Sequence, residues 1–223
     1  MSLSAPRLGA GDLVDALDAR PVRASDVVFR GRVWQVRRDT VDLGEAGEVV
    51  RDYVDHTGAV VVLALREDRG EPEVMVVQQY RHPVRSREWE LPAGLLDVAG
   101  EPPLEAARRE LAEEADLRAQ RWDLLAEYHS SPGGLSEALR VYLARDLHDV
   151  PAHQRHRREG EEHGMPTGWV GLDTAVEAAL AGRVRNAAFV IGVLAARASA
   201  DRGWATLRPA DDPWPAHPRS RDR

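Results

Sequence analysis

A run of seven consecutive apolar residues, at positions 59–65, limits the folds open to this chain more than any other feature. The run is rich in valine, which is β-branched, and it lies between Gly58 and the charged segment 66–70. Apolar runs of this length between turn residues are typical of buried strands. A membrane span would need about 20 apolar residues. We therefore expect residues 59–65 to form a strand inside a sheet, and we expect no association with a membrane.

Further segments follow strand or helix patterns on both sides of this run. Helical spacing of apolar residues from Leu104 onward predicts a helix directly after Pro102 and Pro103, because the first turn of a helix tolerates proline. Strands interleaved with helices indicate an α/β (α+β) domain. The expected strands are residues 27–36, 49–53, 74–79, 139–144 and 169–172, and the expected helices are residues 104–115, 173–181 and 186–198.

Composition excludes several classes of protein. The chain has 223 residues, enough for one domain or for one domain with an appendage, and it has no cysteine. A disulfide framework, a thiolate zinc site and a cysteine nucleophile are therefore excluded. The formal net charge of −7 argues against a nucleic-acid surface, which needs a basic stripe. Residues 1–21 lack the basic start and apolar run of a secretory signal, so we expect a cytoplasmic protein.

Three glutamates crowd one face of the helix expected at residues 104–115. Glu110 and Glu114 are one helical turn apart, and Glu113 lies beside them. Like charges at this spacing destabilise a helix by about 0.2–0.5 kcal/mol per pair. A divalent cation of the Mg²⁺ type, held by carboxylates and substrate phosphates, would offset this repulsion. Helices rich in Arg and Glu are also common as solvated surfaces, so the helix alone leaves both interpretations open.

The residues around this helix resemble the signature of the Nudix hydrolase family. That signature is a glycine, five residues, a glutamate, seven residues, and then Arg-Glu-aliphatic-x-Glu-Glu-x-Gly-aliphatic. Here Gly94, Glu101 and the segment 109–114 (Arg-Glu-Leu-Ala-Glu-Glu) fit it. The spacing departs once, because six residues rather than five separate Gly94 from Glu101.

A second departure is Asp116, which stands where the signature has its last glycine. That glycine would take the left-handed conformation at the C-terminal end of the helix. Aspartate is among the few other residues that adopt this conformation. We therefore expect a modest cost in stability and an intact metal-binding face.

The resemblance implies a Nudix-type α/β/α sandwich with a mixed sheet and an N-terminal β-extension for dimerisation. On this basis the chain divides into an N-terminal tail with dimerising strands at 1–55, a Nudix hydrolase domain at 56–200, and a Pro-rich, mobile C-terminal tail at 201–223. In relatives of this kind the N-terminal strands pair across a two-fold axis. The resemblance therefore implies a homodimer whose active sites take residues from both subunits.

The resemblance also implies metal-dependent hydrolysis of a nucleoside diphosphate derivative. By this likeness Glu110 and Glu114 are ligands of Mg²⁺ or Mn²⁺, and Glu113 is a third carboxylate at the metal cluster. The backbone carbonyl of Ala93 matches a further ligand, and Arg109 matches an orienting ion-pair partner. The physical logic is general, since metal ions neutralise the charge of a diphosphate and lower the pKa of a bound water.

A general base for the attacking water is expected in a charged, glutamate-rich loop. In the ADP-ribose branch of the family a glutamate of this loop is the base, which makes Glu162 the first candidate and Glu161 the second. A solvated acidic loop is the alternative. The neighbouring histidines follow no pattern and are expected to be surface residues: His153, His156 and His163.

Three features resemble the ADP-ribose pyrophosphatase branch in particular. Pro132 and Gly133 lie in Ser-Ser-Pro-Gly-Gly, fifteen residues beyond the signature, and resemble the Ser-Pro-Gly loop of that branch. Arg81, in Gln-Gln-Tyr-Arg-His-Pro, matches an arginine that contacts the substrate. Glu137 matches a glutamate that helps to hold the adenine end from the partner subunit.

Each of these features also has a structural interpretation. The Pro-Gly-Gly segment can be a simple turn, and Arg81 can simply pair with Glu88 or Glu90. With all three in order, the resemblance implies hydrolysis of ADP-ribose to AMP and ribose 5-phosphate. The alternatives are another nucleoside diphosphate derivative such as a nucleotide sugar, a nucleotide-sensing module without catalysis, or a structural dimer with an acidic surface. The complete set of three helix glutamates weighs against the last two.

Overall fold

The computed structural model describes residues 5–68, 70–158, 160 and 163–218. The chain divides into two compact units, residues 1–53 and residues 54–223, and each is described by itself. Glu161 and Glu162, the two candidates for the general base, lie outside the described residues.

The first unit is built on a three-stranded sheet in the order β1-β2-β3, in which β1 and β2 are antiparallel. Its strands are β1 (Val22–Arg30), β2 (Gln35–Asp42) and β3 (Glu48–Asp55). The sequence predicted one strand over residues 27–36, and this is wrong, because the chain reverses between Arg30 and Gln35. The backbone N–H of Gly31 donates to the carbonyl of Trp34 over 2.8 Å. A Cβ at Gly31 would lie 2.7 Å from that carbonyl oxygen, so the hairpin needs glycine there.

The second unit contains a mixed sheet, which among the described residues has eight strands. The central pair, β4 (Ala59–Arg66) and β9 (Ala138–Asp149), is parallel, and the other pairs are antiparallel. The main order is β10-β5-β4-β9-β8-β11, with β6 beside β5 and β7 beside β4. The remaining strands are β5 (Glu73–Arg81), β6 (Ser86–Glu90), β7 (Ala93–Leu95), β8 (Leu117–His129), β10 (Thr167–Gly171) and β11 (Arg208–Pro209).

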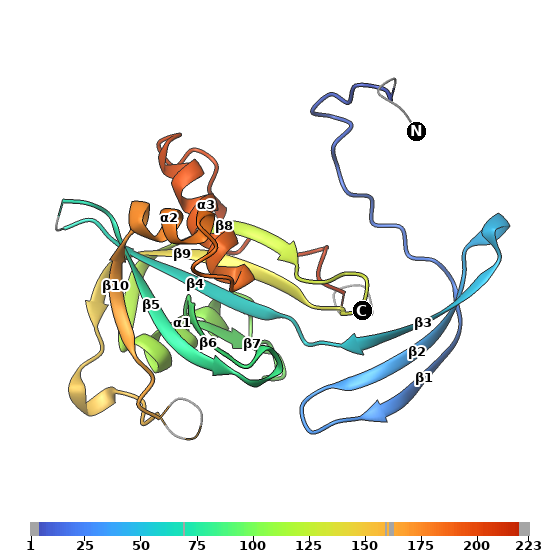
Figure 1. Ribbon diagram of the computed structural model, residues 1–223, viewed down its shortest axis with the longest axis horizontal. Helices are drawn as coiled ribbons and strands as arrows, with labels where there is room; N and C mark the ends of the chain where they lie inside the picture. The colour runs from blue at the N-terminus through green and yellow to red at the C-terminus, as the bar shows by residue number, and fades with distance from the viewer. Residues whose placement is uncertain (1–4, 69, 159, 161–162, 219–223) are drawn as a thin grey trace. The chain divides into compact units, whose positions relative to one another are not determined.

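Helices cover both faces of this sheet (Figure 1). They are α1 (Pro103–Ala115), α2 (Leu172–Leu180) and α3 (Ala187–Ala200), close to the three predicted helices. Alternate side chains of β4 point to opposite faces, and residues 59–65 of this strand are buried, as the sequence predicted. One core cluster includes Val61, Leu63, Leu172, Phe189 and Val193, and the other includes Val60, Val62, Ala107 and Leu111. The result is an α/β/α sandwich.

The long strand β8 was not predicted from the sequence. Its composition, with Leu, Arg, Ala and Glu, favours a helix, and a bulge between Leu124 and Ala126 interrupts the alternation of its side chains. Pairing with β9 along most of its length overrides this local preference. The short strands β6 and β7 were not predicted either.

The described residues 201–218, part of the segment predicted to be a mobile tail, contact the sheet of the second unit. Arg208 and Pro209 form β11 at the edge of β8. The guanidinium of Arg140 is 3% exposed and donates to the carbonyls of Asp212 and Pro213 over 2.8 and 3.2 Å. The same guanidinium lies 4.6 Å from the ring centroid of Trp214. The buried side chain of Arg140, on β9, thus holds residues 212 and 213, which lie in a segment with little secondary structure.

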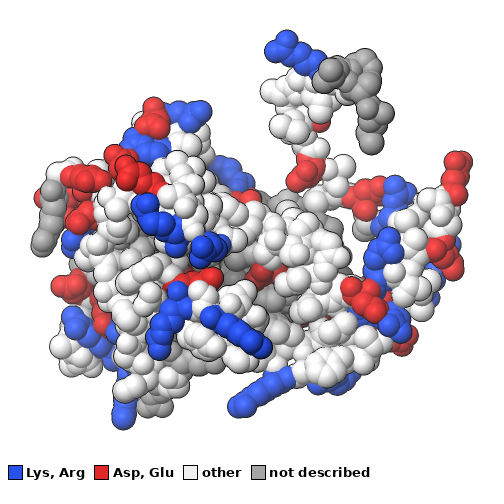
Figure 2. Space-filling view, viewed as in Figure 1, with Lys and Arg blue, Asp and Glu red and all other residues white. Residues whose placement is uncertain are grey.

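No helix in the described part of the chain is long and apolar enough to cross a membrane. Acidic and basic side chains are interspersed over the face drawn in Figure 2, and the described residues visible there do not separate into a basic stripe.

Candidate active site

The helix α1 carries most of the predicted site residues, and its sequence defines both of its ends. Pro102 is the N-cap and Pro103 takes the first helical position, where its missing N–H costs no hydrogen bond. At the other end Asp116 has φ 55°, in the left-handed region, and its N–H bonds the carbonyl of Leu111. The expectation that Asp116 replaces the signature glycine in that conformation is confirmed.

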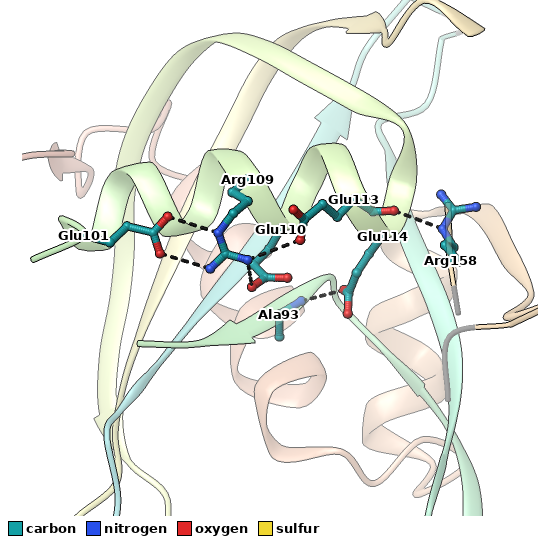
Figure 3. A network of polar contacts seen from close by, with 7 residues as sticks. All are labelled: Ala93, Glu101, Arg109, Glu110, Glu113, Glu114 and Arg158. Atoms are coloured by element: carbon teal, nitrogen blue, oxygen red, sulfur yellow. Dashed lines mark hydrogen bonds and ion pairs between the residues drawn. The ribbon is translucent and has the colours of Figure 1, made fainter. Parts of the chain in front are cut away.

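The carboxylates of Glu110 and Glu114 are buried against the short strand β7. The two residues are only 9% and 7% exposed, and they lie one turn apart on α1. The backbone N–H of Ala93 donates to Oε2 of Glu114 over 2.9 Å (Figure 3). A Cβ at Gly94 would lie 1.9 Å from Oε1 of Glu110, so the strand approaches the helix as closely as glycine allows.

Arg109 links the helix to the loop before it. Its Nε and Nη2 donate to the two carboxylate oxygens of Glu101, each over 3.0 Å. Its Nη1 donates to Glu110 over 2.6 Å and to Glu113 over 3.2 Å (Figure 3). The hydrogen bonds with Glu101 raise the pKa of Arg109 and lower the pKa of Glu101, so both remain charged at neutral pH. The predicted role of Arg109 as an ion-pair partner therefore has a geometric basis, and Glu101 was missed as the residue that orients it.

The donors at this site fit a hard divalent cation, although the described residues do not include three His, Asp or Glu side chains already arranged around one point. Glu110 and Glu114 lie at β7, and Nη1 of Arg109 joins Glu113 to Glu110. Two buried carboxylates beside the backbone of Ala93 offer the oxygen ligands that Mg²⁺ and Mn²⁺ prefer. The structure thus places Glu114 at Ala93 and Glu110 at Gly94, and it places Glu113 beside Arg109.

Arg158 holds the start of the glutamate-rich loop at the C-terminal end of α1. Its Nε donates to the carbonyl of Glu113 over 3.0 Å (Figure 3). Its Nη2 donates to Asp116 over 2.8 Å. Sequence reasoning missed this residue, which directly precedes the segment with the two candidate bases. The nearby histidines are exposed, as expected: His153, His156 and His163.

Arg81 and the loop at 130–134 adopt the structural interpretations that the sequence left open. Arg81 donates to both oxygens of Glu90 over 2.8 and 2.7 Å, and Glu90 is 3% exposed. The Arg81 side chain is still 43% exposed. Pro132 and Gly133 are exposed in a turn closed by the N–H of Leu135, which donates to the carbonyl of Ser131 over 2.9 Å. At these positions the side chain of Arg81 and the turn residues Pro132 and Gly133 are accessible to a substrate.

Two substitutions of Asp116 separate the effect of its left-handed backbone conformation from the effect of its ion pair with Arg158. Asp116→Ala is expected to lower the free energy of unfolding by about 1–2 kcal/mol, because alanine resists the left-handed conformation and the ion pair with Arg158 is lost. Asp116→Gly loses the same ion pair but restores backbone freedom, so its stability should stay within about 0.5 kcal/mol of the parent. Urea denaturation of both variants measures the difference. Equal destabilisation by alanine and glycine would show that the ion pair matters and the left-handed conformation does not.

The sequence and the fold are similar to those of known proteins. The NUDIX domain family matches residues 55–190. The chain is 41% identical over 191 residues to an ADP-ribose pyrophosphatase of Mycobacterium tuberculosis, which covers 86% of this chain and 89% of that protein. An ADP-ribose pyrophosphatase of Bacillus subtilis is 35% identical over 124 residues, 56% of this chain and 65% of that protein. A crystal structure of an ADP compounds hydrolase aligns with a TM-score of 0.69 over 85% of this chain and 99% of that one, at 21% identity, which supports the fold alone.

Proposed function

This chain belongs to the Nudix family, and on that premise we propose that it hydrolyses the diphosphate of ADP-ribose to AMP and ribose 5-phosphate. The observation that carries the proposal is the pair of buried carboxylates, Glu110 and Glu114, packed against Ala93 and Gly94. Its similarity to the ADP-ribose pyrophosphatase of Mycobacterium tuberculosis, along most of both chains, supports ADP-ribose as the substrate.

The residues of α1 would hold one or more divalent cations, Mg²⁺ or Mn²⁺. The ligands proposed are the carboxylates of Glu110 and Glu114 and the carbonyl of Ala93, with Glu113 as a further carboxylate. A bound ion would neutralise the diphosphate and lower the pKa of a water molecule. Burial of the two carboxylates excludes bulk water around them and strengthens their interaction with a cation.

Other residues of the chain would orient the reacting groups. Arg109 fixes the Glu110 carboxylate through a 2.6 Å hydrogen bond, and Glu101 in turn fixes Arg109. Glu162, or Glu161 in reserve, would accept the proton of the attacking water. Arg158 supports this assignment, because it anchors the chain just before that loop to the end of α1.

The substrate would be held outside the metal site by the residues that resemble the ADP-ribose branch. Arg81 is a planar cation suited to a phosphate or a ribose, and its side chain is 43% exposed. Pro132 and Gly133 would shape the loop beside the substrate, and Glu137 would hold the nucleoside end. These assignments rest on the resemblance and on the exposure of the residues.

The first unit is proposed to make a homodimer through its strands. Its sheet exposes large apolar side chains, among them Val28, Phe29 and Val50, which a partner could cover. Sedimentation at micromolar concentration should give twice the mass of one chain. A fully active monomer would contradict the dimer.

Hydrolysis of ADP-ribose tests the function directly. The purified chain with Mg²⁺ should release AMP and ribose 5-phosphate, and it should prefer ADP-ribose to a panel of nucleotide sugars. Preference for a nucleotide sugar would be consistent with Nudix chemistry but would contradict ADP-ribose as the substrate. Binding of ADP-ribose without release of AMP would indicate a nucleotide-sensing module instead.

A further inference from the structure

A buried histidine, His56, lies against the carboxylate of Glu137. It is 6% exposed, and its Nε2 is 3.2 Å from Oε1 of Glu137. Its other ring nitrogen, Nδ1, accepts a hydrogen bond of 3.0 Å from the backbone N–H of Gly58. A backbone N–H can only donate, so Nδ1 must be the acceptor and Nε2 must carry the proton. Nε2, the nitrogen that faces Glu137, is therefore a hydrogen-bond donor.

The carboxylate of Glu137 is held at both oxygens. Oε1 faces His56, and Oε2 accepts a hydrogen bond from Oγ of Ser130. The hydroxyl of Tyr128 has a raised pKa, first because it is buried and second because it is near the negative charge of Glu137. The Glu137 side chain nevertheless keeps 19% of its surface exposed. Its orientation is set from within the protein, while part of it stays accessible from outside.

Backbone hydrogen bonds fix the two segments that carry this pair. The N–H of Val54 donates to Gly134 over 2.9 Å, and the N–H of Ser136 donates back to Val54 over 3.0 Å. The N–H of His56 donates to Oγ of Ser136 over 2.8 Å. These bonds fix the backbone at His56, and the bond from the N–H of Gly58 to Nδ1 fixes its ring, so His56 is a rigid support for Glu137.

We propose that His56 is a positioning residue, which fixes the carboxylate of Glu137 so that it accepts a hydrogen bond from the nucleoside part of the substrate. The inference rests on the proposed function, since it assigns a support to a residue of the same site. The group recognised would be an N–H or O–H donor, such as the amino group of the base or a ribose hydroxyl, because an ionised carboxylate can only accept. A hydrogen bond between His56 and Glu137 that serves only the stability of the fold is the competing interpretation.

The test is the kinetics of three variants with ADP-ribose and Mg²⁺. His56→Phe keeps a ring and removes the donor. It should raise KM about tenfold while kcat changes less than about twofold, by analogy with the 10- to 100-fold effects of residues that orient metal-binding side chains. His56→Gln retains an N–H donor near the position of Nε2 and should recover most of the affinity. Glu137→Gln should raise KM by itself. The double variant His56→Phe, Glu137→Gln should show no further increase, because His56 acts through Glu137.

Additive effects of the two substitutions, or an unchanged KM in His56→Phe, would overturn the inference. A fall in thermal stability with KM unchanged would show that the pair is only structural. If His56→Phe does not fold, Ser130→Ala removes the support of the other oxygen and should raise KM in the same way, and an unchanged KM there also contradicts the inference. Failure of the parent chain to hydrolyse ADP-ribose would contradict the proposed function instead, so the two failures are distinguishable.

Discussion

Replacing Glu110 by glutamine should slow the hydrolysis of ADP-ribose by about 100- to 1,000-fold, at a nearly unchanged fold. The amide has the shape of the carboxylate and can still accept a hydrogen bond from Arg109, which lies 2.6 Å away. It has no negative charge with which to hold a divalent cation, and a metal ion contributes several kcal/mol to stabilising transition-state charge. Each 1.36 kcal/mol corresponds to about a tenfold change in rate. The measurement is kcat at saturating Mg²⁺, with the melting temperature of the variant determined in parallel.

The matched control is Glu105→Gln, which removes the same charge from the first turn of the same helix. Glu105 pairs with Arg108 over 2.7 Å at the surface, and its side chain is 52% exposed. The control should keep its activity within about twofold, because exposed ion pairs contribute little. If Glu110→Gln kept full activity, or if the two variants lost activity equally, the assignment of Glu110 as a ligand would be wrong.

The second large effect is expected from Gly94→Ala, a change of one methyl group on β7. That methyl carbon would lie 1.9 Å from Oε1 and 2.0 Å from Cδ of Glu110, well inside any permitted contact. Either the carboxylate or the strand has to move, and a displacement of about 1 Å in a catalytic group can cost about 100-fold in rate. We therefore expect kcat to fall by about that factor, with a smaller change in stability.

Gly168→Ala is the control for this variant, since it also adds a methyl group to a strand, β10, and that methyl would meet nothing within 4 Å. It should leave kcat unchanged. A fully active Gly94→Ala would mean that the close approach of β7 to α1 does not set the position of Glu110.

The two substitutions probe parts of the site that differ in how readily the sequence reveals them. The signature residues predicted the carboxylates of α1, because a helix places residues four apart on one face whatever lies around it. The support of Glu137 by His56 was not predictable, since the two segments are joined by contacts between residues 80 positions apart, such as that of His56 with Ser136. Arg158 was missed for the same reason, because it reaches α1 from 42 positions beyond Asp116.

The fold shows the same division between local and distant causes. The apolar run at 59–65 predicted β4, and helical spacing predicted α1, since both patterns can be recognised within a short stretch of sequence. The strand β8 could not be predicted, because its residues favour a helix and only pairing with β9 makes it extended.

The packing of residues 208–217 has a consequence for how this protein is made. His217 packs on the two residues that precede β4: its Nε2 lies 3.1 Å from the carbonyl of Thr57, and it would lie 2.5 Å from a Cβ at Gly58. The segment that leads into the central strand therefore has a contact with a residue that the ribosome synthesises 160 positions later. Until that part emerges, the buried Arg140 lacks the carbonyls of Asp212 and Pro213. The nascent domain thus completes its packing only after release of these late residues, and a chain that stops short of them leaves the ribosome with an unfinished sheet edge exposed to aggregation.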